Sequence, residues 1–176
     1  MPHKHIVSSV LLLLIWLSVF GQNNSADKQK EVFAEIRKDR IEILIDTISF
    51  KNFLSRNLSE AIIKSCRLNN VCPLKFQNIA VKKQESEENG LDFFYVTAIR
   101  NGSIQVARRL KQIGNKLYLA DDINNELYHV FAISCGSQDC KLKIVSINGK
   151  LSWIGVVGDN YNNRCIVDIV TTGSKF

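Results

Sequence analysis

Histidine is scarce in this chain, and its scarcity limits the chemistry that the sequence can offer. Two of the three histidines, His3 and His5, precede an apolar N-terminal run that we expect to be removed, so His129 alone would remain. A single histidine cannot build a three-ligand zinc site unless cysteines or carboxylates complete it. The sequence has no G-x-S-x-G motif, so it offers no nucleophilic serine of this type that His129 could activate as a base. Alternation with Leu127 and Phe131 predicts instead a histidine at the edge of the core.

Other signatures of chemistry are also missing from the sequence. The cysteines lack the C-x-x-C spacing of redox and zinc modules, and the chain has neither a glycine-rich phosphate loop nor an internal repeat. The sequence therefore predicts no catalytic residues, no metal site and no cofactor. An enzyme that uses Asp, Lys or Tyr without histidine remains an alternative, although general acid–base catalysis most often recruits histidine.

The first 21 residues have the three regions of a secretory signal peptide. Met1–His5 is basic, residues 6–20 form an apolar run broken only by serines, and small residues precede Gln22. The apolar run is too short for a stable membrane span, and no other segment is long and apolar enough to be one. We therefore expect residues 1–21 to be a signal peptide and the protein to be secreted or periplasmic.

After cleavage, residues 22–30 are predicted to be a flexible lead-in and residues 31–176 a single α+β domain, as the length suggests. Removal of the one lysine in the signal lowers the formal net charge from +6 to +5. Outside the cytosol such a charge favours anionic surfaces over nucleic acid, although it also serves solubility. The expected partner is a protein or an envelope component, with no nucleic acid.

The stretch from Leu91 to Thr172 predicts an antiparallel β-meander. Asn101-Gly102 and Asn148-Gly149 are strong hairpin signals, because a type I′ turn needs positive φ at both central residues. Both faces of residues 93–100 are apolar, which predicts a strand interior to the sheet. About seven or eight strands fit either a curled sheet or a barrel, and the sequence does not choose between them. The predicted strands are 93–100, 104–111, 116–119, 127–134, 142–147, 151–157 and 165–172, with 76–82 as a further candidate.

Two oxygen-rich segments, 121–126 and 159–163, are predicted loops, and the charged segment 82–90 is a third. Carboxylate and amide oxygens can ligate calcium, but neither oxygen-rich segment follows the calcium-loop pattern. Asp and Asn are also ordinary turn residues, and we favour that interpretation.

The residues before the meander predict a helical approach to the sheet. Residues 31–40 have the pattern of a short amphipathic helix. Residues 41–48 alternate as in a strand, although the pattern can also continue a helix. Residues 50–66 place apolar side chains at helical spacing along one stripe, and this helix is expected to cover one face of the sheet. The predicted class is α+β, an N-terminal helical segment packed on the meander.

The five cysteines predict disulfides if the chain is exported. Cys135 and Cys140 flank a short reversal, so a bridge between them is geometrically easy, and Cys66 with Cys72 could do the same at the end of the helix. Cys165 would then remain unpaired, although longer-range pairing through it is an alternative.

Binding is the function that these residues favour. We place the candidate binding region near Trp153, Tyr118, Arg108 and Arg109, where basic and aromatic side chains gather. The alternative for the arginines is a solvated strand edge protected against aggregation. Two further hypotheses are an inhibitor or immunity-type protein that blocks an enzyme with its Cys135–Cys140 hairpin, and a carrier of a small apolar ligand.

Overall fold

The computed structural model describes residues 31–38, 40–69, 73–85, 90, 92–100, 102–121, 127–136, 139–158, 160–172 and 176, and of residues 160–164 only the backbone. The predicted signal peptide and lead-in lie outside the described residues, as does Cys72.

Eight strands form the main sheet, and every pairing in it is antiparallel. The central strand is β5, which pairs with β4 along one edge and with both β7 and β6, end to end, along the other. The strands of this sheet are β1 (Val32–Arg37), β2 (Arg40–Ile43), β3 (Asn78–Glu85), β4 (Asp92–Arg100), β5 (Ile104–Ile113), β6 (Lys116–Leu119), β7 (Val130–Cys135) and β11 (Val167–Thr171).

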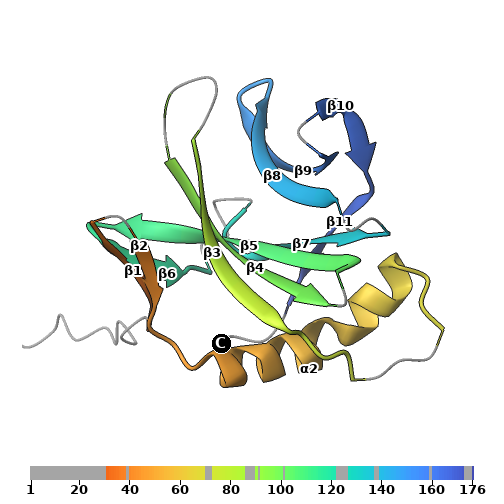
Figure 1. Ribbon diagram of the computed structural model, residues 1–176, viewed down its shortest axis with the longest axis horizontal. Helices are drawn as coiled ribbons and strands as arrows, with labels where there is room; N and C mark the ends of the chain where they lie inside the picture. Colours follow the sequence, from red (N-terminus) through yellow and green to blue (C-terminus); the bar gives the residue numbers. More distant parts are fainter. Residues whose placement is uncertain are drawn as a thin grey trace, which may run out of the picture. The chain divides into compact units, whose positions relative to one another are not determined.

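The main sheet curls until it is nearly closed and barrel-like (Figure 1). β1 extends the sheet beyond β6 and carries β2 on its other edge, and β2 comes back into contact with β3. β3, β4, β5 and β6 follow one another as a meander, whereas β1 pairs with β6 although about 80 residues separate them in the chain. The fold is thus the expected α+β arrangement with a curled antiparallel sheet.

A second, three-stranded sheet lies over the opposite face of the main sheet from the helix (Figure 1). It consists of β8 (Cys140–Ile147), β9 (Lys150–Val157) and β10 (Asn160–Cys165). Successive β4 side chains alternate between two cores: Phe94 and Val96 face the helix, while Phe93 and Tyr95 face the second sheet. The prediction that this strand is buried on both faces is confirmed.

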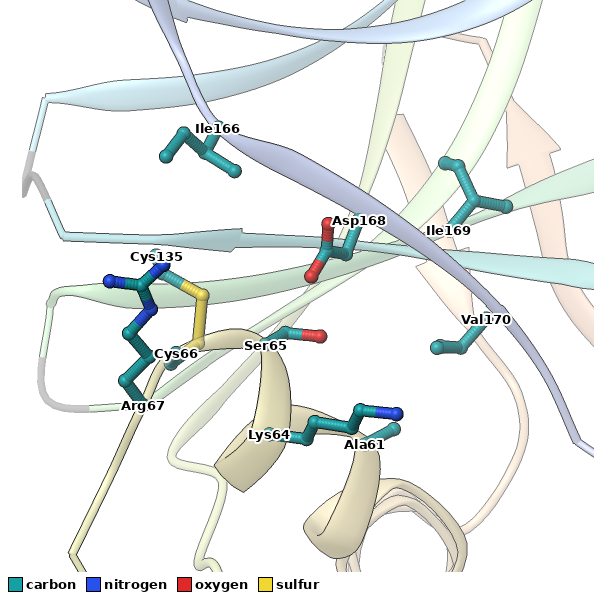
Figure 2. Close-up of a pocket in the computed structure, with 10 residues that line it drawn as sticks. All are labelled: Ala61, Lys64, Ser65, Cys66, Arg67, Cys135, Ile166, Asp168, Ile169 and Val170. Atoms are coloured by element: carbon teal, nitrogen blue, oxygen red, sulfur yellow. A yellow bond between two sulfur atoms is a disulfide. The ribbon is translucent and has the colours of Figure 1, made fainter.

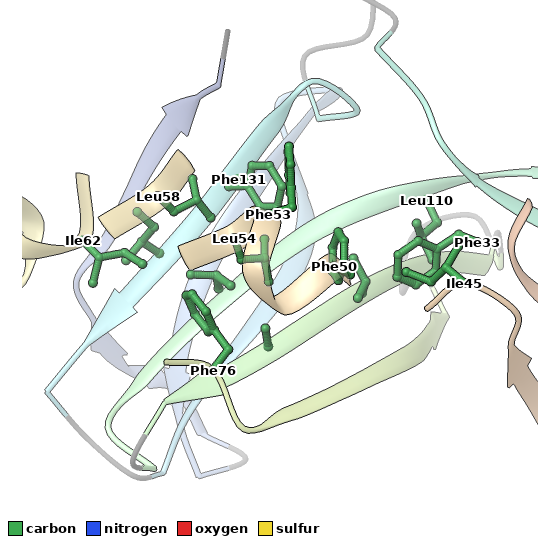
Figure 3. Packing of buried hydrophobic residues seen from close by; sticks show 14 of the residues in the cluster. Phe33, Ile45, Phe50, Phe53, Leu54, Leu58, Ile62, Phe76, Leu110 and Phe131 are labelled. Atoms are coloured by element: carbon green, nitrogen blue, oxygen red, sulfur yellow. The ribbon is translucent and has the colours of Figure 1, made fainter. Parts of the chain in front are cut away.

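The helix α2 (Thr47–Ser65) covers the concave face of the main sheet. It begins at Asp46, whose carboxylate accepts hydrogen bonds from the backbone N–H groups of Ile48 and Ser49 and so caps the first turn. Its stripe of Phe50, Phe53, Leu54, Leu58 and Ile62 is buried against the sheet, as the sequence predicted (Figure 3). Burial of each such side chain contributes about 1.5–3 kcal/mol. No helix in the described part of the chain is both long and apolar enough to cross a bilayer.

Three secondary-structure predictions are wrong. Residues 82–85 of the predicted charged loop belong to strand β3, because they pair with residues 92–95 of β4. Residues 31–40 hold strand β1 instead of a helix, because β2 and β6 pair with its two edges while Phe33 and Ala34 become fully buried. Residues 160–163 belong to β10 instead of a loop, because β10 pairs with the backbone of β9. The register of this pairing shifts between Asn160 and Arg164. The prediction of a strand at 41–48 holds only for its first residues, because Asp46 starts the helix.

The disulfide pairing differs from both short-range bridges that the spacing suggested. Cys66 at the end of α2 is bonded to Cys135 at the end of β7, and Cys140 is bonded to Cys165, so Cys165 is not unpaired. The physical reason is topological: β7 runs under the helix, so its last residue meets the helix end, while Cys140 and Cys165 lie on β8 and β10, on either side of β9.

Candidate functional site

The four residues of the predicted binding region do not form one exposed surface. Arg108 is 2% exposed and turns toward the helix-side core, whereas Trp153 is 7% exposed and lies in the other core, between the two sheets. Tyr118 is half-buried on β6, opposite Val32 and Lys111. The interpretation of Arg108 as a solvated residue on a strand edge is wrong, because β5 is the central strand of the main sheet.

Arg108 acts as an internal clamp. Its guanidinium donates hydrogen bonds to the carbonyls of Tyr128 and Ala120 and to a carboxylate oxygen of Asp121, each at 2.7–2.9 Å, and lies 5.0 Å from the Phe131 ring centroid. Burial lowers the pKa of Arg108, while the hydrogen bond that Arg108 donates to Asp121 opposes that shift. The clamp therefore ties the residues just after β6, Ala120 and Asp121, and Tyr128 just before β7 to the central strand.

Arg109 points to the other face and is held between two rings. Its guanidinium carbon lies 5.0 Å from the centroid of Phe93 and 4.5 Å from that of Tyr128, distances typical of cation–π contacts. Partial burial lowers the pKa of Arg109. The basic–aromatic grouping that the sequence indicated therefore exists, but it is used inside the molecule.

Trp153 packs edge-on against Tyr95, with ring centroids 5.4 Å apart. Its buried indole N–H has no hydrogen-bond partner among the described residues. Trp153 lines neither the groove between α2 and β11 nor the hollow at the β1–β2 turn.

A groove of about 850 Å³ lies between the last turns of α2 and strand β11 (Figure 2). The helix side of the groove is formed by Ala61, Lys64 and Ser65, and the Cys66–Cys135 disulfide bounds one end. The strand side is formed by residues 166 and 168–170. The disulfide fixes the spacing of the two walls, because it ties the end of the helix to β7, the neighbour of β11 in the sheet.

Charged side chains of both signs line this groove (Figure 2). Asp168 points from β11 toward the helix end, where Lys64 and Arg67 lie. None of the three forms an ion pair with another described residue. Arg67 has φ +49°, the left-handed conformation in which helices usually end on glycine. The chain thus holds an arginine side chain at the groove in a backbone state that costs a non-glycine residue about 1 kcal/mol.

The strand wall carries exposed apolar side chains. Ile166 is 75% exposed and Ile169 is 50% exposed. Among the described strands, β11 pairs only with β7, so it is an edge strand of the main sheet. Edge strands are usually protected by charged residues, proline or bulges, and in its sequence Val-Asp-Ile-Val-Thr β11 has only Asp168 in that role.

A second hollow, of about 600 Å³, lies at the β1–β2 turn and is lined by Ile36, Arg37, Lys38, Arg40 and Asn115. The charge of Arg37 is engaged there by Glu35 and Glu42, each at 2.7 Å. None of the residues that line this hollow is an exposed isoleucine.

The structure adds little to the catalytic and metal hypotheses. His129 is half-buried just before β7, and its predicted neighbours Leu127 and Phe131 lie in different cores. No three His, Cys, Asp or Glu side chains gather at one point within the described residues. The side chains of the two candidate calcium loops, Asp121 excepted, lie outside the described residues.

The groove was missed at the sequence level because its walls are about a hundred residues apart in the chain. A usable signal was present, however: the segment Ile166–Thr171 combines β-branched residues with a single charge and no proline, which is unusual for a last, edge-forming strand. Comparison of the chain with protein-family models, with curated proteins and with solved structures finds no match.

Proposed function

We propose that this chain is an exported binding protein that holds its partner in the groove between α2 and β11. The observation that carries the proposal is the coincidence, in one groove, of two exposed isoleucines, a strand edge with no described strand beside it and three charged side chains without ion-pair partners among the described residues. Exposed apolar groups next to unpaired charges are typical of surfaces that another molecule covers.

Export is the second part of the proposal. The N-terminal sequence has the pattern of a signal peptide, and two disulfides are compatible with an extracellular or periplasmic location. N-terminal sequencing of the protein recovered from its native cells tests this part. We expect a mature chain that begins at Gln22; a chain that retains residues 1–21 inside the cell would contradict export.

The two other binding hypotheses have less support. An inhibitory hairpin stiffened by a Cys135–Cys140 bridge loses its rationale, because each of these cysteines is bonded elsewhere. An apolar ligand inside the curled sheet would need space that α2 occupies, since the gap among Phe50, Leu54 and Phe131 has no room even for water.

Position-specific cross-linking tests the site. In one variant a photoreactive benzoylphenylalanine replaces Ile169 in the groove. In the matched control it replaces Ile147 on β8, a residue that is 46% exposed. Each variant is expressed in the native cells and irradiated. We expect an adduct from Ile169 and none from Ile147; equal labelling at both positions, or labelling at Ile147 alone, would remove the groove from consideration.

A further inference from the structure

We propose that the occupant of the groove is an extended peptide segment that adds as a strand to the free edge of β11 and places an acidic side chain against Lys64 or Arg67. This inference rests on the proposed function and names the class of partner.

The free edge of β11 would recognise the backbone of the peptide. One edge of β11 is paired with β7 over all five of its residues, from Val167 to Thr171. The other edge has no strand beside it in the described part of the chain. A strand edge presents a row of N–H and C=O groups, and an added peptide strand satisfies them in the way that peptide-binding domains use sheet edges. An acyl chain cannot satisfy these groups, which favours a peptide over a lipid.

The dimensions of the wall set the length of the segment. Five residues of β-strand extend over about 17 Å, so a peptide of about four to six residues would match β11. Along it, Ile166 and Ile169 are the most exposed apolar side chains of the groove. Apolar or β-branched peptide residues would cover them and remove that surface from water.

The charges set the sequence preference. Lys64 lies in the last turn of α2 and Arg67 just beyond the helix end, and their charged ends point to different sides of that end (Figure 2). An acidic peptide side chain would meet one of these two cations. Asp168 lies on β11 itself, so the peptide residue directly opposite Asp168 should be basic or carry a hydroxyl, because like charges across a strand pair repel.

The test begins with a random linear peptide library displayed on phage and panned on the mature, disulfide-intact protein. Synthetic copies of the enriched peptides are then titrated by fluorescence polarisation. We expect Lys64→Glu and Arg67→Glu each to weaken binding about threefold to fivefold, the upper part of the range for exposed ion pairs. Arg56→Glu, an exposed arginine on the same helix outside the groove, should change the affinity less than about twofold.

Two refinements separate this binding mode from simple charge attraction. Replacement of the peptide's acidic residue by lysine should restore binding to the Lys64→Glu protein. N-methylation of the peptide backbone should weaken binding about tenfold at every second residue and have little effect at the residues between, because only alternate N–H groups face the partner strand. Circular dichroism of each variant checks folding, and Lys64→Gln replaces Lys64→Glu if the reversed charge disturbs the helix end.

The possible outcomes are distinct. Uniform sensitivity to N-methylation, or loss of binding with Arg56→Glu as large as with Lys64→Glu, overturns the strand-addition proposal. Dimerisation in sedimentation that Lys64→Glu abolishes, without enrichment of any peptide, assigns the groove to a second copy of the chain. An Ile169 cross-link to a lipid overturns the peptide inference and leaves the proposed function standing, whereas the absence of any Ile169 cross-link removes both.

Discussion

The side-chain amide of Gln84, on β3, hydrogen-bonds to both the backbone N–H and the carbonyl of Ile144, on β8, as a neighbouring strand would. The distance from the Ile144 nitrogen to Gln84 Oε1 is 3.0 Å. Gln105 on β5 accepts a similar bond from the N–H of Leu142. Two glutamines of the main sheet thus pair with the backbone of β8 and hold the second sheet against the first.

Removal of the Gln84 amide should loosen the second sheet. Because Gln84→Ala leaves a buried N–H and carbonyl of Ile144 without partners, we expect a loss of about 1–3 kcal/mol in the free energy of unfolding. Urea denaturation measures the change. Gln112→Ala is the control, since the Gln112 amide binds the Gly114 carbonyl at an exposed turn, and its effect should stay within about 0.5 kcal/mol. Equal effects of the two variants would contradict the pairing role of Gln84.

Arg108 should be indispensable for stability, in contrast to its neighbour. Arg108→Met removes the donors to Tyr128 and Ala120 and leaves buried carbonyls unpaired, so we expect a loss of about 3 kcal/mol or more. Arg109→Met loses two cation–π contacts at a half-buried site, about 1–2 kcal/mol. Thermal and urea unfolding of both variants check the order, and a larger loss from Arg109 would refute it.

Asp46 should make the stability of α2 dependent on pH. The Ser49 hydroxyl, with the backbone N–H of Ile48, holds the pKa of Asp46 below its ordinary value of 3.8. A lowered folded-state pKa means that the ionised cap stabilises the fold above pH 3.8 and that this contribution is lost as the pH falls through the folded value.

The measurement compares the melting temperatures of the wild type and Asp46→Asn from pH 7 down to pH 2. Asparagine keeps the cap without ionising, so the advantage of the wild type should shrink as the solution is acidified. Ser49→Ala, which removes the strongest donor to the carboxylate, should move the pKa of Asp46 back toward 3.8 in an NMR titration. A wild-type advantage that grows in acid would reverse the sign we assign.

Local signals in the sequence were sufficient for much of the fold. The α2 stripe, the two apolar faces of β4 and the Asn148-Gly149 turn are each decided within a few residues, and the turn has the expected positive φ at both positions, 54° and 74°. The sequence predicts a helix where β1 forms, because the state of β1 depends on β2 and β6, and β6 lies about 80 residues away. Non-local pairing overrides a short periodic pattern.

The site was less accessible to sequence reasoning for the same reason. Burial of Arg108 depends on the carbonyls of Ala120 and Tyr128, which its own segment does not reveal. The disulfides join residues 69 and 25 apart, so spacing alone favoured the wrong, shorter pairs. A basic residue beside an aromatic one indicates a surface only when the strand is at an edge, and edges are set by the whole sheet.

The Cys140–Cys165 disulfide should depend on the absence of a side chain at Gly155. Gly155 pairs with Leu142 on one side and Cys165 on the other, and a Cβ there would lie 2.5 Å from the Cys165 Sγ and 2.8 Å from a Val167 methyl. Gly155→Ala should therefore destabilise the oxidised protein by about 1–3 kcal/mol through overpacking.

A double-mutant cycle separates this clash from other effects of the substitution. A Cys140→Ser/Cys165→Ser background lacks the disulfide and the Cys165 Sγ that a Cβ at Gly155 would meet. We therefore expect Gly155→Ala to lower the free energy of unfolding less in that background than in the oxidised wild type. Gly114→Ala serves as the control, because a Cβ at Gly114 meets nothing within 4 Å and any penalty comes from its φ of +62° alone. That penalty should be the same in both backgrounds. An equal cost of Gly155→Ala with and without the disulfide would show that the methyl is accommodated elsewhere, by Val167 or by a shift of β9.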